Sequence, residues 1–287
     1  MWIYRRSFAA IHLEMGISMR NQFKWNKYLI AGGIITIVML LLAIVGTFWT
    51  PYSTTSMSAA EKFAAPSFKH IMGTDNFGRD IFSRVMKGLG TTMVVGILVV
   101  SVSGAVGIFI GALTGFFGGI VDEAIMRIND AINGFPSILL SLVVISVLGT
   151  GQLNVIFALS IVFVPSFVRI VRSEYIRLRD MEYVNSARIM GVSKVRILFV
   201  HILPNVLSVF WVSVLIGFNN AILAESGMSY LGIGVQPPDA SLGKMLSDAQ
   251  GYMFAAPWYA MSAGISIVIL VLGVSLLGEG IRRCRND

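Results

Sequence analysis

The sequence that decides the fold is Glu182-Tyr183-Val184-Asn185-Ser186-Ala187-Arg188-Ile189-Met190-Gly191, followed ten residues after the glycine by His201-Ile202-Leu203-Pro204-Asn205. Both segments lie in a polar stretch, 169–205, that carries seven Lys or Arg residues in a chain that is otherwise mostly apolar. A glycine readily adopts the positive φ that ends a helix, and a proline suits the first turn of a helix. We therefore predict a helix over about 181–190, a turn at Gly191, and Pro204 in the first turn of the next helix.

The composition indicates a membrane protein. Of the 287 residues, 55% are hydrophobic and 13% are charged, and the mean hydropathy of +0.77 lies outside the usual soluble range. A net charge of +7 is also found in nucleic-acid-binding proteins. Here, however, the basic residues cluster beside apolar runs and do not alternate with exposed aromatic residues, so we expect contact with lipid and no nucleic-acid partner. The single cysteine, Cys284, excludes a disulfide framework and a thiol metal site.

Long uncharged runs predict the membrane spans, since a helix needs about 20 apolar residues to cross roughly 30 Å of hydrocarbon. The run 131–168 is too long for one helix and breaks at 149–152, so it supplies two helices joined by a tight turn. The fold class is therefore an all-α membrane protein with six transmembrane helices. The runs that supply these helices are 29–50, 88–121, 131–168 for two, 197–224 and 257–278.

The distribution of basic residues predicts the orientation. Sixteen Lys and Arg residues fall on the side that holds both termini and the 169–205 stretch, against six on the other side. Both termini are therefore expected in the cytoplasm, with the first span a retained anchor because no cleavage signal precedes it. The resulting division of the chain is a cytoplasmic arm 1–28, a first span 29–50, an extracytoplasmic loop 51–87, a core 88–281 with a cytoplasmic loop 173–200 and an extracytoplasmic loop 225–256, and a cytoplasmic tail 282–287.

Polar side chains inside the spans are candidates for the lining of a passage, because an unpaired polar group in lipid is costly and usually turns inward. These candidates are Asn129, Asn133, Asn219 and Asn220. The alternative role for each is an interhelical hydrogen bond that holds the bundle together. Glycines recur along the second span at Gly104, Gly107, Gly111, Gly115 and Gly118, which favours close approach of another helix.

These features together resemble one known family, the C-type permeases of dipeptide, oligopeptide and nickel ABC importers. The resemblance covers nearly everything after Leu29. The family's cytoplasmic coupling loop has Glu-Ala-Ala followed by Gly, and Asn185, Ser186, Ala187 and Gly191 stand at those positions. Asn185 and Ser186 depart from this pattern, since the family has Glu and Ala there. Glu182 supplies an acidic group one turn before Asn185. The resemblance implies that a partner ATPase docks here through Glu182, Asn185, Ser186, Ala187, Arg188 and Gly191, with Ser186 and Ala187 open to that partner. On charge alone, an ordinary basic cytoplasmic loop is the alternative.

Gly73-Thr74-Asp75-Asn76-Phe77-Gly78-Arg79-Asp80 and Ser83-Arg84 are similar to the family's segment outside the membrane before the second span. Charged residues there recur at spacings of three to five, which predicts a short interfacial helix with internal ion pairs. The resemblance also allows a second role, the docking of a receptor, for Asp75, Arg79, Asp80 and Arg84. The alternative is that these residues only stabilise the short helix through their ion pairs.

Further matches to the family occur at the start of the third span, after the fifth span and at the C-terminus. Asp122, Arg127 and Asp130 lie at the start of the third span, where we expect them to pair with one another. The segment 225–243 resembles the family's extracytoplasmic loop, although Leu242 stands where the family usually has Trp. In the closing segment, Leu277 to Arg282, Glu279 replaces the family's Asp.

The resemblance implies a partnership with other subunits. No Gly-x-x-x-x-Gly-Lys-[Ser/Thr] loop is present to bind nucleotide phosphates, so ATP and Mg are expected on partner ATPase subunits and no cofactor on this chain. The expected assembly contains a second homologous permease, two ATPase subunits and an extracytoplasmic substrate-binding protein in a prokaryotic cell membrane. Its expected mechanism is alternating access driven by the coupling helix.

Two other readings stay open. An enzyme is disfavoured, because the chain has no His-Glu-x-x-His pair and no Gly-x-Ser-x-Gly elbow, and its three histidines lie far apart. A stand-alone channel or secondary transporter also suits six spans with polar residues inside them. Peptides are the first expected substrate, and nickel or a metal chelate is the alternative.

Overall fold

The computed structural model describes residues 26–286 as a bundle of helices, and the greater part of the predicted arm, 1–25, lies outside these residues. Within them, the only paired extended residues form an isolated bridge between Thr74 and Asp80. The α-helices are α2 Lys27–Phe48, α3 Ile81–Phe117, α4 Gly119–Asn133, α5 Ser137–Leu148, α6 Gln152–Arg179, α7 Glu182–Ile189, α8 Lys194–Arg196, α9 Leu203–Tyr230, α10 Leu242–Ala249 and α11 Pro257–Asn286. Short 3₁₀ turns cover Ala59–Glu61 and Gln250–Tyr252, and a π-helical turn covers Ile197–Ile202.

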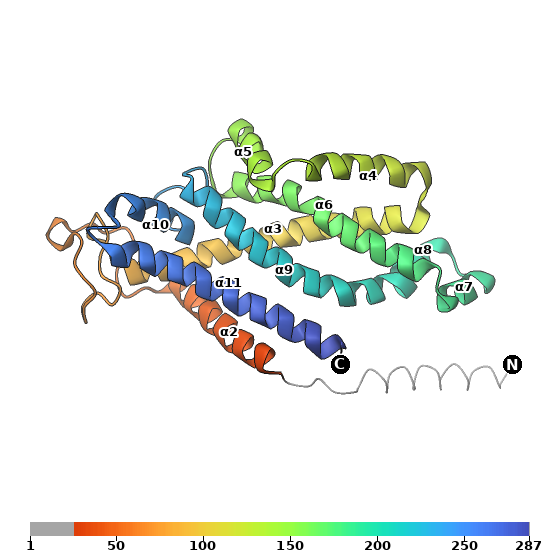
Figure 1. Cartoon of the computed structure of the whole chain (residues 1–287), viewed down its shortest axis with the longest axis horizontal. Helices are drawn as coiled ribbons and strands as arrows, with labels where there is room; N and C mark the ends of the chain where they lie inside the picture. Colours follow the sequence, from red (N-terminus) through yellow and green to blue (C-terminus); the bar gives the residue numbers. More distant parts are fainter. Residues whose placement is uncertain (1–25, 287) are drawn as a thin grey trace.

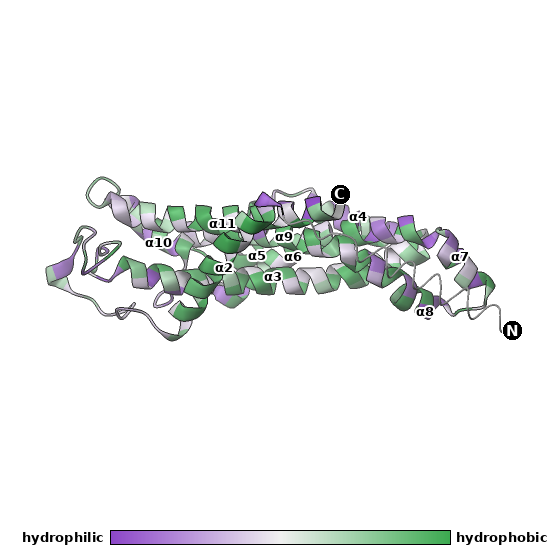
Figure 2. Ribbon diagram, turned by 90° about the horizontal axis from the view of Figure 1, so that it is seen from below, coloured by the Kyte–Doolittle hydropathy of each residue, from purple (hydrophilic) through white to green (hydrophobic). Residues whose placement is uncertain are grey.

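The long helices lie side by side, with α7 and α8 at one end of the bundle and α10 at the other (Figure 1). Five helical segments are long and apolar enough to cross a membrane: α2, α3, α6, the continuous stretch 194–230 and α11. Apolar residues dominate the middle of these helices, while hydrophilic residues gather around α7 and at the opposite end of the bundle (Figure 2). The prediction of an all-α membrane protein is confirmed.

The third predicted span is not one helix. α4 and α5 meet at an angle of 93° across residues 134–136, so the sixth span exists only if this bent pair counts as one. Pro136 explains the break, because a proline has no N–H to donate and disfavours helical backbone in the residue before it. The predicted turn between the third and fourth spans is confirmed: α5 ends at Leu148, and α6 begins at Gln152.

The glycines of α3 allow α6 and α9 to lie close to it. A Cβ atom on Gly107 would lie 2.4 Å from Cβ of Phe167, and one on Gly111 would lie 2.7 Å from Cβ of Val171. Packing at such a distance needs glycine on one side of the interface. Gly118 is different from the others, because it follows the end of α3 with φ +65° and makes the turn into α4.

Several predicted boundaries are wrong. The second span begins at Ile81, seven residues before the predicted 88, because Asp80 caps the helix by accepting a hydrogen bond from Ser83 N at 2.7 Å. The predicted loop 225–256 begins inside α9, which continues to Tyr230, and it contains α10. The predicted tail 282–287 is mostly the last turn of α11, and the predicted cytoplasmic loop 173–200 begins inside α6.

Pro204 lies in the first turn of α9, as predicted, but no loop separates this helix from the segment before it. The helix is continuous from Lys194 to Tyr230, and Pro204 lies in it directly after the π-helical turn Ile197–Ile202. Leu203 N donates to Leu198 O, five residues back. The wider turn suits a proline that can neither donate a hydrogen bond nor fit against the carbonyl four residues earlier.

Candidate functional site in a cavity and a short terminal helix

The helix α7 stands at one end of the bundle and shows two unlike faces. Val184 and Ala187 are buried against the core of α3, α6 and α9, and only 2% of Ala187 is exposed. Glu182, Asn185, Ser186 and Arg188 are exposed, as are Ile189 and Met190. The predicted helix is confirmed, whereas the expectation that Ala187 is open to a partner is wrong, because its methyl group anchors α7 to the bundle.

The end of α7 is fixed by its backbone. Gly191 has φ +75°, its N–H donates to Arg188 O at 3.0 Å, and Val192 N donates to Ala187 O at 3.0 Å. This pair of bonds is the Schellman arrangement that ends many helices at a glycine. A Cβ at Gly191 would meet no atom within 4 Å, so the requirement for glycine comes from the backbone conformation and not from space.

Two side chains connect α7 to its neighbours. Asn185 donates to Asp180 O at 3.2 Å and accepts from Arg188 Nη1 at 3.3 Å, so its amide stabilises the start of α7. Asn205 of α9 donates to the hydroxyl of Tyr183 at 3.4 Å. Partial burial raises the pKa of the Tyr183 phenol, which stays neutral and able to accept this bond.

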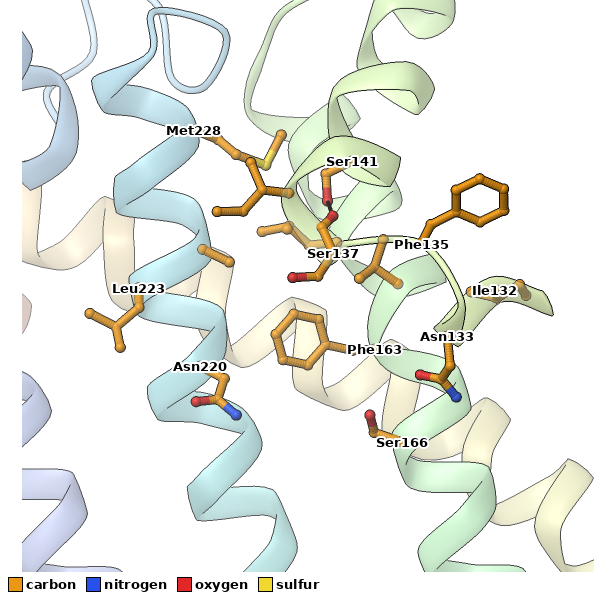
Figure 3. A pocket seen from close by; sticks show the side chains of 14 residues that line it. Ile132, Asn133, Phe135, Ser137, Ser141, Phe163, Ser166, Asn220, Leu223 and Met228 are labelled. Atoms are coloured by element: carbon orange, nitrogen blue, oxygen red, sulfur yellow. Dashed lines mark hydrogen bonds between the residues drawn. The ribbon is translucent and has the colours of Figure 1, made fainter. Parts of the chain in front are cut away.

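A cavity of about 400 Å³ opens where the α4–α5 break faces α6 and α9. Ser141, Leu159 and Met228 are buried at its floor, while Asn133 and Asn220 are exposed around it. The side chains come from four helices and surround one space (Figure 3). We call this space the central cavity. Its polar side chains are Asn133, Ser137, Ser141, Ser166 and Asn220.

The three serines of the central cavity are not among the candidate residues that the sequence pattern indicates, which are all asparagines. Ser137 and Ser141 lie one helical turn apart on α5, and Ser141 Oγ donates to Ser137 O at 2.8 Å. Ser166 lies next to Pro165, the proline inside α6. The spacing of Ser137 and Ser141 on one face of α5 could have indicated a polar surface. It is a weak indication, because serine is common inside membrane helices as a donor to its own backbone.

The four candidate asparagines have different positions. Asn133 and Asn220 line the central cavity, and a place in the translocation path stays a prediction for them. The prediction is wrong for Asn129, because this side chain is buried and donates to Pro165 O at 3.3 Å. Asn219 lines a second cavity of about 390 Å³ between α9 and α11. With its amide turned to suit both groups, it donates to Val271 O at 3.3 Å and accepts from Ser275 N at 3.2 Å.

Asp122, Arg127 and Asp130 of α4 are all paired, but not with one another as expected, and the two aspartates pair with arginines of α6. Asp122 accepts two hydrogen bonds from Arg172 of α6, at 2.6 and 2.7 Å. Asp130 pairs with Arg169 of α6 at 3.1 Å. Arg127 pairs with Glu123 at 3.3 Å, both exposed. Because α4 lies along α6, the arginines of α6 are the nearer partners, so these contacts hold the two helices together.

The loop 51–80 contains no interfacial helix at the predicted position. Asp75 accepts hydrogen bonds from Phe77 N at 2.8 Å and Arg79 N at 2.9 Å, which form a turn between Gly73 and Gly78, both at φ +75°. A side chain that bonds its own backbone in this way competes with helix formation. The ion-pair part of the prediction is confirmed, since Arg79 Nε donates to Asp75 Oδ2 at 2.7 Å.

A receptor-docking role is contradicted for three of the four residues proposed for it. Asp75, Asp80 and Arg84 are buried, with 0%, 3% and 2% exposed, and Arg79 is partly buried. Asp80 Oδ1 also accepts a hydrogen bond from His70 Nδ1 at 2.9 Å. These groups therefore stabilise the loop against the start of α3. A partly exposed carboxylate of the same loop, Glu61, has its pKa lowered by the hydrogen bond from Lys69.

The sequence matches two family profiles. Residues 107–283 match the family described as binding-protein-dependent transport system inner membrane component. Residues 16–66 match the N-terminal transmembrane domain of oligopeptide transport permease C. The first match covers more than half of the chain and includes α4 to α10 entirely.

Individual relatives match over nearly the whole length. The dipeptide transport system permease protein DppC of Alkalihalophilus pseudofirmus is 39% identical over 262 residues, which cover 91% of this chain and 86% of the relative. The DppC protein of Haemophilus influenzae is 34% identical, covering 91% and 90%. The glutathione transport system permease protein GsiD of Pectobacterium atrosepticum is 33% identical, covering 98% and 96%.

A solved structure shares the fold. In inward-facing conformations of the MetNI methionine ABC transporter, one chain superposes with a TM-score of 0.55 and 18% identity, covering 69% of this chain and 94% of that one. At this identity the likeness shows the fold alone. Together with the family profile and the membrane-spanning helices, it shows that this chain is a multi-pass inner-membrane permease subunit of the binding-protein-dependent transport system inner membrane component family.

Proposed function

We propose that this chain forms half of the translocation path of an ATP-driven importer for dipeptides or oligopeptides. The observation that carries the proposal is the combination of the central cavity, which opens between α4, α5, α6 and α9, with α7, a short helix with a buried anchor and an exposed face at one end of the bundle. Peptides are preferred because relatives that match over most of the chain are dipeptide permeases. No relative reported above is named for nickel, so the metal alternative gains no support from them.

The proposed partners are a second homologous permease, two ATPase subunits that hold ATP and Mg, and an extracytoplasmic binding protein. The chain itself is proposed to hold no cofactor and to catalyse no reaction. The end of the bundle that carries α7 is proposed to lie in the cytoplasm, together with both termini, because the excess of basic residues favours that side.

The ATPase contact is proposed to use the exposed face of α7. Glu182, Asn185, Ser186 and Arg188 are the groups on that face that a partner reaches. Ala187 and Gly191 act indirectly: the buried methyl group fixes the helix to the bundle, and the glycine fixes the turn that follows. Movement of a docked ATPase is thereby passed to α6 and α9, which line the central cavity.

The test is peptide uptake into proteoliposomes. The complete importer, supplied with its binding protein and ATP, is expected to accumulate a labelled dipeptide, and the same importer without ATP is not. Vesicles that hold this chain without its ATPase subunits are expected to take up nothing. Uptake by the chain alone would support a channel or secondary transporter and contradict the proposal.

A further inference from the structure

The central cavity has no charged side chain in its lining. Its walls are mostly apolar, with Phe163 pointing into the space and Met228 close to Ser141, and its polar groups are two amides and three hydroxyls (Figure 3). Among the described residues, those that line the central cavity include no Asp, Glu, Lys, Arg or His. A passage that selects ions by charge is lined by side chains of one charge sign. The lining of the central cavity lacks such side chains.

Most of the polar groups in the cavity have unused hydrogen-bonding capacity. Within residues 26–286, the side chains of Asn133, Ser137, Ser166 and Asn220 have no hydrogen-bond partner, whereas Ser141 donates to its own helix. Each amide offers both donors and an acceptor, and each hydroxyl offers one donor and an acceptor. These are the groups that match a peptide bond, which itself carries one N–H donor and one C=O acceptor.

One ion pair between α4 and α6 lies beside the central cavity. Asp130 lies one turn before Asn133 on α4, Arg169 lies one turn after Ser166 on α6, and the two pair at 3.1 Å. The second cavity, which shares Asn220, differs, because Glu279 there pairs with both Arg282 at 2.7 Å and Arg283 at 2.6 Å. The fields of Asp130 and Arg169, two opposite charges in contact, largely cancel at a distance, so this pair favours neither sign of cargo in the central cavity.

We infer that the central cavity holds cargo through hydrogen bonds to its peptide backbone and passes side chains of either charge. This inference rests on the proposed peptide-import function and specifies how this chain's half of the path treats its substrate. Neutral donors and acceptors satisfy the backbone groups that every peptide shares, while the apolar walls and the adaptable Met228 accept side chains of different shape. Discrimination by charge is then left to the rest of the importer.

The experiment places a charge where the inference puts the cargo. Asn220→Asp is nearly isosteric and adds one negative charge, and Asn220→Lys adds a positive one. Maximal uptake rates of an anionic and a cationic dipeptide are measured in the complete importer, and each variant's anionic-to-cationic ratio is divided by the wild-type ratio. The binding protein's own preference cancels, because it delivers the same two peptides in every case.

The ratio is expected to fall by about tenfold or more in Asn220→Asp and to rise in Asn220→Lys, since like charges in contact are strongly disfavoured. Ser166→Asp, on the α6 side of the cavity, is expected to lower the ratio in the same way. It replaces Asn220→Asp in the experiment if that variant does not assemble. Asn220→Gln and the exposed loop variant Gln250→Glu should leave the ratio unchanged. Equal effects on both peptides in Asn220→Asp and Ser166→Asp would overturn the inference. Absence of dipeptide uptake by the wild-type importer would instead overturn the proposed function.

Discussion

Arg172 Nε and Nη2 donate to Asp122 Oδ1 and Oδ2 at 2.6 and 2.7 Å, so two parallel hydrogen bonds join α4 to α6. Both side chains are partly buried. Elsewhere α4 exposes apolar side chains, among them Ile120 and Ile128, so it gains little from packing against the rest of this chain. The Asp122–Arg172 pair is therefore a main attachment of α4 to α6.

Asp122→Ala is expected to loosen α4. Hydrogen bonds to charged groups are worth about 1.5–3 kcal/mol each when their partner is removed, so the thermal midpoint of the purified protein should fall clearly. The matched control is Arg127→Ala, which breaks the exposed pair with Glu123 and should cost at most about 1 kcal/mol. A double-mutant cycle with Arg172→Ala measures the coupling, and additive effects of the two changes would show that the pair does not hold the helices.

Asp75→Ala is expected to destabilise the external loop strongly. This buried carboxylate accepts bonds from two backbone N–H groups and from Arg79, and its loss also leaves Arg84 buried without its nearest charge. Breaking a buried ion pair from one side costs about 3–5 kcal/mol. Hydrogen exchange over residues 51–80 checks the effect, with Lys69→Gln, an exposed residue of the same loop, as the control. Unchanged exchange in Asp75→Ala would show that the turn does not depend on this carboxylate.

Gly111→Leu is expected to separate α3 from α6. Even a Cβ at this position would lie 2.7 Å from Val171 and 2.8 Å from Val168 O, so a leucine forces the two backbones apart. Overpacking of this kind costs about 1–3 kcal/mol or more. Gly33→Leu on α2 is the control, because no atom lies within 4 Å of a Cβ there. The two variants are compared by thermal unfolding in detergent, and equal midpoints would contradict the close packing of these helices.

Gly191→Val is expected to uncouple ATP hydrolysis from uptake while leaving membrane insertion intact. A left-handed backbone costs about 1–2 kcal/mol for a residue with a Cβ and more for a β-branched one, so the turn after α7 shifts. Gly191→Asn tests the cause at the same position, because asparagine tolerates this conformation and should retain more uptake per ATP hydrolysed. Equal uptake per ATP in wild type and Gly191→Val would contradict the role of the turn.

The sequence predicts the parts of this fold that depend on local composition. Apolar runs locate the spans because the lipid requires about 20 apolar residues per helix. Gly191 ends α7 as expected, because its positive φ is a property of one residue and its immediate neighbours. The spacing of Gly107 and Gly111 likewise indicates a helix contact, although the identity of the contacting helix, α6, comes only from the structure.

Properties that depend on partners far away in sequence were not predictable in this way. Asp122 has Arg127 close by in the chain, yet it pairs with Arg172, fifty residues away, because α4 folds back along α6. Periodicity did not show which face of α7 meets the bundle, so Ala187 was expected to be accessible. Asp75 was assigned to a helix because charge spacing alone does not reveal that its carboxylate bonds its own backbone.

Site-specific photocrosslinking can show whether the exposed face of α7 meets an ATPase subunit. A photoreactive residue is placed at Ser186, which is exposed, or at Ala187, which is buried one position further along the same helix. In the assembled importer the account predicts a crosslink to the ATPase from position 186 and a much weaker one from position 187. Absence of an ATPase crosslink from position 186, or a crosslink from there to the extracytoplasmic binding protein, would contradict it.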